Sequence, residues 1–279
     1  MAINNYFCTM FSKRLNIILS FTILAAIILS CKGYEQILKS RDYKLKLSTA
    51  MDYYNTGEYV RASALFDQIA PVYKGTIKAD TVFYYQAMSY YNQRDYILSG
   101  HYFNSLATDY PNSVYAEEAD FMTGYCYYKL SPKPSLDQES TANAITTFQL
   151  FMIKYPSSPR VKEAQTYINE MRDKLVEKSY LNAKLYFNMG DYKASIIALK
   201  NSLNEFPDTK YREELLFLIL KSSYLLADNS IISKRKERFQ DAVDEYYTFI
   251  SEFPESKYKK EAQKMYEIST NITGIKDQL

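Results

Sequence analysis

The residues able to do chemistry are few and stand in no catalytic pattern. The single histidine, His101, and the cysteine Cys126 both lie in stretches that we expect to be helical. The acid pair Glu213-Glu214 falls at an expected helix start, where the helix dipole favours negative charge. The sequence has no Gly-rich phosphate loop, no Gly-x-Ser-x-Gly, no His-Glu-x-x-His and no Cys-x-x-Cys. We therefore predict a protein that is not an enzyme and that uses no metal or cofactor, with His101 and Cys126 as packing or surface residues.

The N-terminus carries the one reactive group to which we assign a role, the thiol of Cys31. Lys13 and Arg14 precede an uncharged apolar run that ends in Ile-Leu-Ser-Cys at residues 28–31. The run is shorter than the ~20 residues of a membrane-spanning helix. A basic start, an apolar stretch and a small residue before the cut describe a secretory signal. The last four residues resemble a bacterial lipobox, whose cysteine is diacylated; an ordinary signal peptide with a chance cysteine is the alternative.

This pattern predicts a lipoprotein signal peptide over residues 1–30, with translation starting at Met1 or Met10, and lipidation of Cys31. Two or three acyl chains hold a protein on a membrane almost permanently. Lys32 follows the cysteine, in place of the Asp that would favour retention in the inner membrane. We therefore expect a protein anchored by its lipid to the outer membrane, on the periplasmic face.

Composition excludes other classes of function. The 279 residues are 47% hydrophobic, which is ample for a buried core. Lys and Arg number 34 against 32 acids, and the predicted signal peptide removes two of the cations. A nucleic-acid binder needs a basic excess, so we expect no nucleic-acid partner. The 29 Tyr and the absence of Trp indicate many half-buried aromatic positions rather than one dry core.

Four segments of the remaining chain share one motif, an aromatic-Pro pair followed by Ser or Thr two residues after the Pro. They are residues 110–113, 155–158, 206–209 and 253–256. Pro pushes the preceding residue out of the helical region, and the Ser or Thr would serve as N-cap of the next helix. A Glu follows five residues after each of these caps, at Glu118, Glu163, Glu214 and Glu261.

A second regularity lies upstream of each Pro. In the second repeat Ala87 and Tyr90 stand on an expected first helix. Phe103 stands on the expected second helix, which Pro111 ends. The small residue and the Tyr recur at Ala50 and Tyr53, at Gly124 and Tyr127, and at Ala183 and Tyr186. This pattern resembles the tetratricopeptide repeat, in which a small residue lets two helices approach and the aromatic residues fill the gap between them. We expect Tyr186 to be one of these gap-filling rings.

The predicted fold is therefore all-α, a tetratricopeptide-repeat superhelical solenoid of about five helix pairs with a capping helix over residues 257–271. The predicted divisions are a lipidated N-terminal linker over 31–42, repeats one to three over 43–157, repeats four and five with the capping helix over 158–271, and a tail over 272–279. Insertions are expected at 131–141 and at about 228–237. The second would be a basic loop that is either a contact site or neutral surface. An extra helical stretch over 160–176 should lead into the fourth repeat.

A candidate peptide-binding groove follows from the repeat register. In each repeat, the residue four positions after the small residue should face the concave side of the stack. These residues are Tyr54, Tyr91 and Tyr128 in the first three repeats, and Phe187 and Leu225 in the last two. Met51 and Met88, which stand three positions before the first two of these, are adaptable side chains that suit variable ligands. The alternative is plain packing, because Tyr53, Tyr90 and Tyr127 are immediate neighbours.

A lipobox followed by five such repeats resembles the BamD family of outer-membrane β-barrel assembly lipoproteins. The matching motifs are Asp137-Gln138-x-x-Thr141-x-x-Ala144, Tyr155-Pro156-x-Ser158 and Gly190-Asp191-Tyr192-x-Ala194. The resemblance implies a periplasmic scaffold that binds a BamA-like barrel subunit through its C-terminal repeats and unfolded outer-membrane proteins through its N-terminal repeats. The alternatives are a lipidated pilotin that escorts secretin subunits, a peptidoglycan-linked trimming cofactor, or another cell-envelope adaptor.

Overall fold

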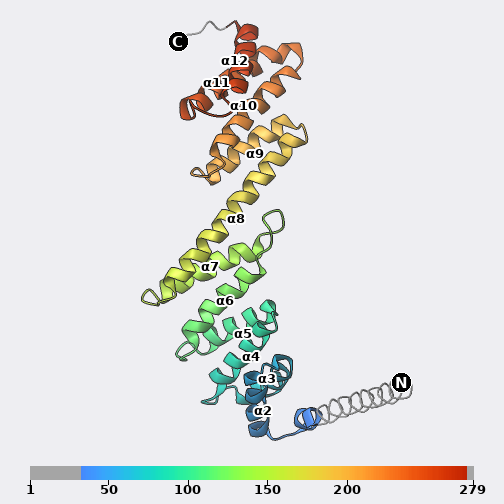
Figure 1. Cartoon of the computed structure of the whole chain (residues 1–279), viewed down its shortest axis with the longest axis vertical. Helices are drawn as coiled ribbons and strands as arrows, with labels where there is room; N and C mark the ends of the chain where they lie inside the picture. The colour runs from blue at the N-terminus through green and yellow to red at the C-terminus, as the bar shows by residue number, and fades with distance from the viewer. Residues whose placement is uncertain (1–32, 275–279) are drawn as a thin grey trace, which may run out of the picture. The chain divides into compact units, whose positions relative to one another are not determined.

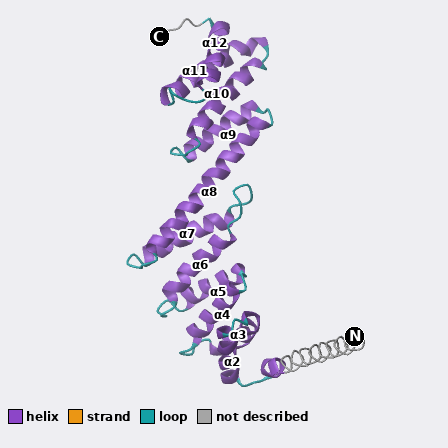
Figure 2. Cartoon of the chain, in the orientation of Figure 1, coloured by secondary structure: helices purple, strands orange, loops and turns teal. Residues whose placement is uncertain are grey.

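The computed structural model describes residues 33–274, which are helical throughout apart from short connections and contain no strand (Figures 1 and 2). They form two compact units, one ending at Lys129 and the other starting at Leu130. The all-α prediction is confirmed. In the part of the chain that the structure describes, no helix combines the length and apolarity needed to cross a bilayer.

The first unit is built from helices that pack on the next one in the chain, the last two meeting at Ser99 and Cys126. They are α2 (Tyr43–Asn55), α3 (Tyr59–Tyr73), α4 (Ala79–Asn92), α5 (Tyr96–Asp109) and α6 (Ala116–Leu130), preceded by a short helix over residues 33–39. The predicted small residues Ala50, Ala62 and Ala87 are completely buried. They leave room for Phe66 and Phe103, which are also fully buried between the helices. The small-residue and Phe pattern therefore does what the sequence predicted.

The second unit continues the same plan with longer helices. They are α7 (Glu139–Lys154), α8 (Val161–Asn188), α9 (Tyr192–Glu205), α10 (Arg212–Asp228), α11 (Ile232–Glu252) and α12 (Lys259–Thr273). The predicted extra stretch and the first helix of the fourth repeat form one continuous helix of 28 residues, α8. The capping helix is α12, and it packs on both α10 and α11.

The turns inside the first, second and fourth helix pairs share a repeated arrangement. Asp95 and Asp191 each accept a hydrogen bond from a backbone N–H in the first turn of the next helix, as an N-cap does. The residue before this position takes a left-handed backbone, with φ of 82° at Gly57 and 79° at Gly190. Glycine adopts this conformation without steric cost, which explains its place in these turns.

The aromatic-Pro steps differ from the prediction in one detail. Ser113 Oγ accepts a hydrogen bond from the N–H of Tyr115 at 3.1 Å, and Thr209 Oγ1 accepts one from the N–H of Tyr211 at 3.2 Å. The carbonyl oxygens of Ser113 and Thr209 also accept hydrogen bonds, from the N–H groups of Ala116 and Arg212, three residues later. Each step is therefore a separate turn that precedes the helix. The N-cap of α10 is Tyr211, and the prediction that Thr209 caps this helix is wrong by two residues.

The same step occurs once more without its proline. At residues 73–76 the N–H of Thr76 donates to the carbonyl of Tyr73 at 2.9 Å, as the Ser113 N–H does to Tyr110 at 3.0 Å. Lys74 stands where the other copies have Pro, and Gly75 has a φ of 82°. The sequence pattern did not predict this copy, because it lacks the aromatic-Pro pair.

The two predicted insertions differ in structure: the first is a loop and most of the second is helical. Residues 131–138 form a loop, in which buried Gln138 donates to the carbonyl of Lys133 at 2.8 Å and accepts from Thr141 at 2.6 Å. Lys174 of α8 donates to Ser131 Oγ at 2.7 Å, so the loop is tied down and the Gln138 and Thr141 of the sequence motif have a structural role. The predicted loop over 228–237 is wrong, because α11 begins at Ile232. Arg235 pairs there with Asp228 at 2.6 Å, and no Gly or Pro interrupts the helix.

Tyr186 also corrects a prediction. It is 42% exposed on α8 and therefore fills no gap between helices. Tyr180, one turn before Ala183, is 8% exposed and stacks on Tyr211 with centroids 4.1 Å apart. This stack repeats that of Tyr84 on Tyr115 in the second repeat, with centroids 4.3 Å apart, and the small residue Ala183 is buried as expected.

Candidate functional site

Cys31, the predicted lipidation site, lies outside the described residues. The predicted groove residues all lie within them. Tyr54, Tyr91 and Tyr128 are half-buried near the C-terminal ends of α2, α4 and α6. Met51 and Met88 are half-buried one turn earlier on α2 and α4.

Each predicted tyrosine of the first two repeats packs on the first residue of the next helix. The rings of Tyr54 and Tyr59 meet edge-on at 5.5 Å, and those of Tyr91 and Tyr96 meet at 5.6 Å. These contacts are typical aromatic pairs and help to hold the two helices of a repeat together. The packing interpretation is therefore correct for one edge of these rings.

Other ring contacts lead from one first helix to the next. Tyr54 of α2 meets Tyr85 of α4 at 4.9 Å, and Tyr91 of α4 meets Tyr125 of α6 at 6.2 Å. Tyr125 in turn stacks on Tyr128 at 5.6 Å. Tyr125 thus joins Tyr91 to Tyr128, and Tyr85 extends the contacts of Tyr54 to α4; the sequence pattern predicted neither residue. A helical spacing of four and three residues on each first helix would have found most of the set.

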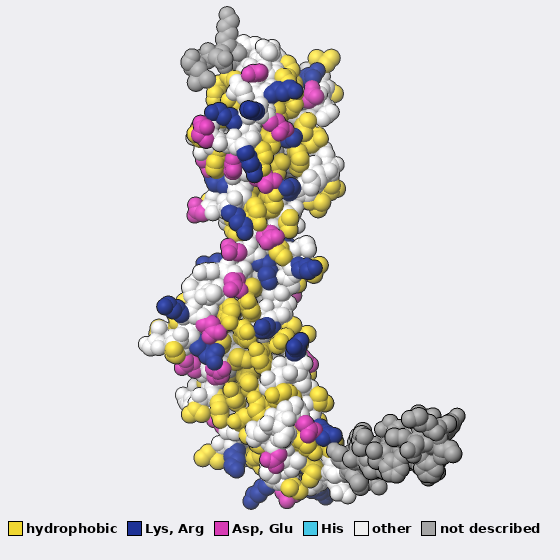
Figure 3. Space-filling model, in the orientation of Figure 1, with side chains coloured by type: hydrophobic (Ala, Val, Ile, Leu, Met, Phe, Trp, Pro, Cys, Tyr) yellow, Lys and Arg dark blue, Asp and Glu magenta, His cyan; other side chains and the backbone are white. Residues whose placement is uncertain are grey.

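We call this set the aromatic strip. Its members are Met51 and Tyr54 on α2, Tyr84, Tyr85, Met88 and Tyr91 on α4, and Tyr125 and Tyr128 on α6. Residues spaced by three and four positions share one face of a helix, so the strip occupies one face of each first helix. Figure 3 shows hydrophobic side chains, Tyr included, gathered in a broad area over the part of the first unit around α4 to α6.

The tyrosines beside the strip face elsewhere. Tyr90 donates from its hydroxyl to Asp67 of α3 at 2.6 Å, and Gln86 donates to the other oxygen of the same carboxylate at 2.7 Å. Tyr53 packs near Arg61, whose guanidinium lies 5.5 Å from the ring centroid. In the pairs Tyr53-Tyr54 and Tyr90-Tyr91 the two tyrosines therefore differ in role, and Tyr54 and Tyr91 are the members on the strip.

The strip carries neutral hydroxyl groups. Burial raises the pKa of Tyr91 to about 12, with neighbouring Tyr125 and Tyr96 adding to the effect. Burial also raises the pKa of Tyr84 to about 12, and the charge of Glu118 contributes. Lys129 places its ammonium 5.0 Å from the centroid of the Tyr125 ring. The strip thus offers apolar ring surface and hydrogen-bonding hydroxyls with little formal charge.

The corresponding face of the second unit is charged. Lys184 of α8 donates to Tyr180 and forms an ion pair with Glu214 of α10 at 2.7 Å. Lys221 of α10 pairs with Glu261 of α12 at 2.7 Å and lies 5.9 Å from the centroid of Phe187. Two of the repeated glutamates therefore bind a lysine of the preceding first helix, a role beyond the helix dipole. Leu225 is half-buried on α10.

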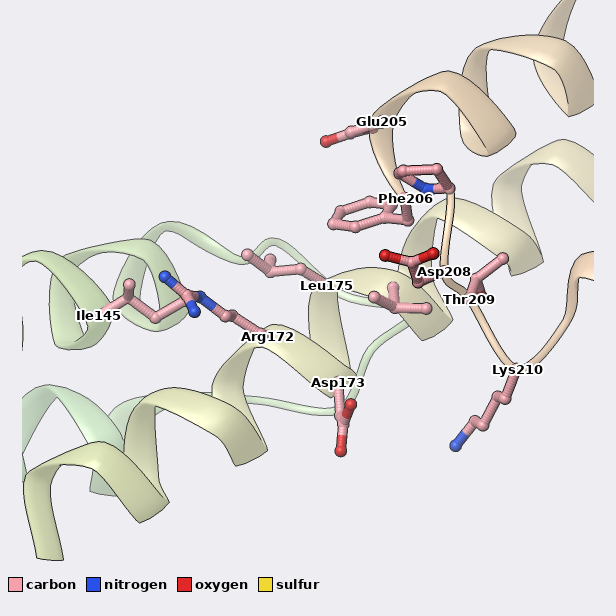
Figure 4. A pocket seen from close by; sticks show the side chains of 11 residues that line it. Ile145, Arg172, Asp173, Leu175, Glu205, Phe206, Asp208, Thr209 and Lys210 are labelled. Carbon is pink, nitrogen blue, oxygen red and sulfur yellow. The ribbon is translucent and has the colours of Figure 1, made fainter. Parts of the chain in front are cut away.

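The second unit also contains an open pocket of about 680 Å³ (Figure 4). Ile145 of α7, Leu175 of α8 and Phe206 of the step before α10 give it an apolar wall. Arg172, Asp173, Glu205, Asp208 and Lys210 bring charges of both signs. No sequence pattern predicted this pocket, although the extra helical stretch expected over 160–176 forms part of its wall.

The two residues considered for nucleophilic or acid-base chemistry have structural settings. Cys126 is buried, and burial raises the pKa of its thiol to about 11 despite a hydrogen bond to Ser99 at 3.4 Å. Gly100 lies opposite it, where an added Cβ would be 3.1 Å from the Cys126 Cβ. His101 is exposed on α5.

Successive helix pairs with small residues at their crossings and a repeated step between pairs define a tetratricopeptide-repeat protein. The chain belongs to the YfiO family, described as outer membrane lipoproteins, whose model matches residues 43–238. The match runs from the first residue of α2 into α11. The chain is thus a member of a family of outer-membrane lipoproteins with a fold suited to binding other proteins.

Solved structures similar to this chain are also repeat proteins. The TPR2AB-domain:pHSP90 complex of yeast Sti1 is 12% identical, with a TM-score of 0.36, and the match covers 82% of this chain and 98% of that one. A tetratricopeptide repeat protein from Parabacteroides merdae is also 12% identical, with a TM-score of 0.36 and coverage of 83% and 100%. No curated protein matches the chain.

Proposed function

We propose that this protein is a scaffold of the machinery that folds and inserts β-barrel proteins in the outer membrane, anchored by lipid on Cys31 and facing the periplasm. The family match over residues 43–238 is the observation that carries the proposal. A scaffold without catalysis agrees with the buried setting of Cys126. The partner in this proposal is a BamA-like barrel subunit, as the resemblance to the BamD family implies.

The first unit would receive the client. An unfolded barrel protein offers extended segments in which apolar and aromatic side chains alternate with polar ones, and these match a row of rings with hydroxyl groups. The strip's Met51 and Met88 can adjust to different side chains. We propose that the strip binds the extended, aromatic-ended final strand of such a client.

The binding test uses a peptide of that kind with a fluorescent label. Tyr91→Ala and Tyr128→Ala should each weaken binding at least tenfold while the helical circular dichroism stays unchanged. Tyr102→Ala is the matched control, because this half-buried tyrosine on α5 stacks on Tyr90, away from the strip. Binding should change little between low and high salt, since the strip carries little formal charge.

Two results would count against the strip. Wild-type affinity in the folded Tyr91→Ala and Tyr128→Ala variants would mean that the strip is only packing. A steep fall of affinity with salt would place the client on a charged face instead, such as that of Lys184 and Lys221.

The second unit would contact the barrel subunit. Its pocket combines apolar wall residues with charges of both signs, a mixture common at protein interfaces. Arg172→Glu reverses an exposed charge at this pocket and should reduce recovery of the barrel subunit. The pilotin alternative predicts that a secretin accompanies the protein instead, so the identity of the co-purified protein separates the two functions.

A further inference from the structure

The segment just after the predicted lipid anchor is folded onto the first repeat. Residues 33–39 form a short helix ahead of α2, the first coloured turn in Figure 1. Tyr34, Ile37 and Leu38 pack against the buried cluster of the first repeat, which includes Phe66 and Ile69. Most of the predicted linker over 31–42 is therefore part of the folded unit.

Contacts at both ends hold this helix in place. At its start, the Tyr34 ring meets Tyr53 edge-on at 5.7 Å, and the Arg61 guanidinium lies 5.4 Å from the Tyr34 centroid. At its end, Lys46 donates to the carbonyl of Leu38 at 3.0 Å and to Gln68 Oε1 at 2.6 Å.

Lys46 is only 5% exposed. A buried ammonium is costly unless it is well bonded, and a cation suits the negative end of a helix. The directional hydrogen bonds of Lys46 thus hold the end of the short helix in one position, which apolar contacts alone would not do.

This arrangement limits how far the first repeat can lie from the acylated cysteine. Cys31 precedes Gly33 by two residues, which span at most ~7 Å in any conformation. A free chain over 31–42 would instead reach ~40 Å. Because Tyr34 contacts Tyr53 and Arg61, the part of the first repeat that bears these residues must stay near the lipid.

We propose that the docked helix seats the first repeat on the membrane, with the face around Tyr34, Tyr53 and Arg61 against the lipid headgroups. The inference rests on the proposed lipid anchor at Cys31. Tyr rings suit the boundary between water and acyl chains, and an Arg suits headgroup phosphates. Arg61 also pairs with Glu58 in the adjoining turn. Tyr54 of the aromatic strip follows Tyr53 in the chain, so a client bound there would lie beside the membrane from the start.

The test measures how close one end of the first repeat lies to lipid. The lipidated protein is reconstituted into phosphatidylethanolamine–phosphatidylglycerol vesicles containing brominated lipid, with a fluorophore on a cysteine at Thr56→Cys or Ile77→Cys. Thr56 lies in the turn between α2 and α3, whereas Ile77 lies beyond the other end of α3 and is 97% exposed. A helix of this length separates the two sites by ~20 Å. Quenching at residue 56 should be at least threefold stronger than at residue 77.

A tether variant provides the control. Ten Gly and Ser residues inserted between Lys32 and Gly33 should lower quenching at residue 56 to the value at residue 77, with flotation of the protein on vesicles unchanged. Equal quenching at the two sites without the insertion, or quenching that the insertion leaves unchanged, would overturn the inference. Protein that does not float at all would overturn the lipid anchor and this inference together. The vesicles contain neither client nor barrel subunit, so failure of the scaffold function would not affect the result.

Hydrogen exchange tests the docked helix independently. The amides of residues 36–39 should exchange at least tenfold more slowly in the wild-type protein than in Tyr34→Ala or Lys46→Ala. Exchange at the same rate in all three proteins would show that the helix is not docked, and the inference would fall.

Discussion

Arg94 occupies a backbone position that suits glycine. Its φ is 64°, and it stands in the turn of the second repeat where the first and fourth repeats have Gly57 and Gly190, with φ of 82° and 79°. A side chain with a Cβ is strained in this left-handed region by ~1–2 kcal/mol. Sequence comparison of the three turns predicts the turn itself, but the strain becomes visible only in the backbone angle.

Arg94→Gly should therefore stabilise the protein. We expect a gain of about 0.5–1 kcal/mol in the free energy of unfolding, less than the full strain because Gly also loses more entropy on folding. A urea titration followed by circular dichroism measures it. Gly57→Ala, which introduces a Cβ at the matching position, should lose a similar amount. A loss of stability in Arg94→Gly would contradict this account of the turn.

The aromatic residues of the fourth repeat make a second contrast. Tyr180 is 8% exposed and stacked on Tyr211, whereas Tyr186 is 42% exposed. Tyr180→Ala should cost ~3 kcal/mol because it opens a cavity, and Tyr186→Ala should cost less than ~1 kcal/mol. Both are measured by denaturant titration. Equal costs would mean that the packing around α8 differs from that described.

Tyr186 also shows the limit of reading residues from a repeat pattern. The spacing from Ala183 to Tyr186 matches that from Ala50 to Tyr53, so the pattern assigned both tyrosines to the same gap. In the structure α8 is one long helix, and α9 leaves the Tyr186 side of it largely uncovered. Burial depends on what the neighbouring helices cover, which the spacing within one helix does not contain.

At the scale of helices, ion pairs between consecutive first helices of the second unit add to the apolar packing. Burial raises the pKa of Glu214, but the hydrogen bonds from Lys184 and Tyr180 outweigh it and leave this pKa below its ordinary value. A carboxyl group with a lowered pKa stabilises the fold above its unfolded pKa, ~4.3 for Glu, and loses that contribution as pH falls through the folded value.

We therefore predict that Glu214 contributes to the free energy of unfolding in a pH-dependent way. From pH 7 down to pH 3 the wild-type protein should lose about 0.5 kcal/mol more than Glu214→Gln, as expected of a partly exposed pair. Thermal unfolding of both proteins across this range measures the difference. Asp228→Asn, which removes a different ion pair of the same unit, controls for general charge effects. Identical pH dependence of wild type and Glu214→Gln would show that the pair contributes nothing.

The helices themselves followed from the sequence better than their connections. The aromatic-Pro steps and the small residues predicted every helix of the repeats, because Pro and close helix packing leave strong local patterns. The basic stretch 233–237 was assigned to a loop because the repeat period required extra residues there. Its Lys and Arg residues favour a helix, and α11 simply begins earlier. The repeat length predicts how many residues are inserted, but it does not predict whether the inserted residues extend a helix or form a loop.

At the scale of the whole molecule, the lipid anchor predicts where the protein is found. Cys31→Ser removes the thiol that we propose to be acylated, and it should take the protein out of the outer-membrane fraction while the repeats remain folded. Fractionation of cells followed by immunoblotting measures it, with Cys126→Ser as the matched control that should remain in the membrane. A Cys31→Ser protein that still sediments with outer membranes after a high-salt wash would show that lipid is not the anchor.

The sequence predicted the fold class, the family resemblance and five of the eight residues of the aromatic strip. Tyr54, Tyr91 and Tyr128 followed from the repeat register, whereas Tyr85 and Tyr125 were missed because their link to the others lies between repeats. The pocket at Phe206 was missed for a similar reason, since α7, α8 and the step before α10 come together only in the folded unit.

The central claim, a scaffold of barrel assembly, is tested most directly by purifying the lipidated protein from outer membranes in mild detergent and identifying what accompanies it. The account predicts a barrel subunit of the BamA type in near-equal amount, recovered with the wild type and with Cys126→Ser, and reduced with Arg172→Glu. Recovery of a secretin in its place, or of no barrel protein at all, would contradict the claim.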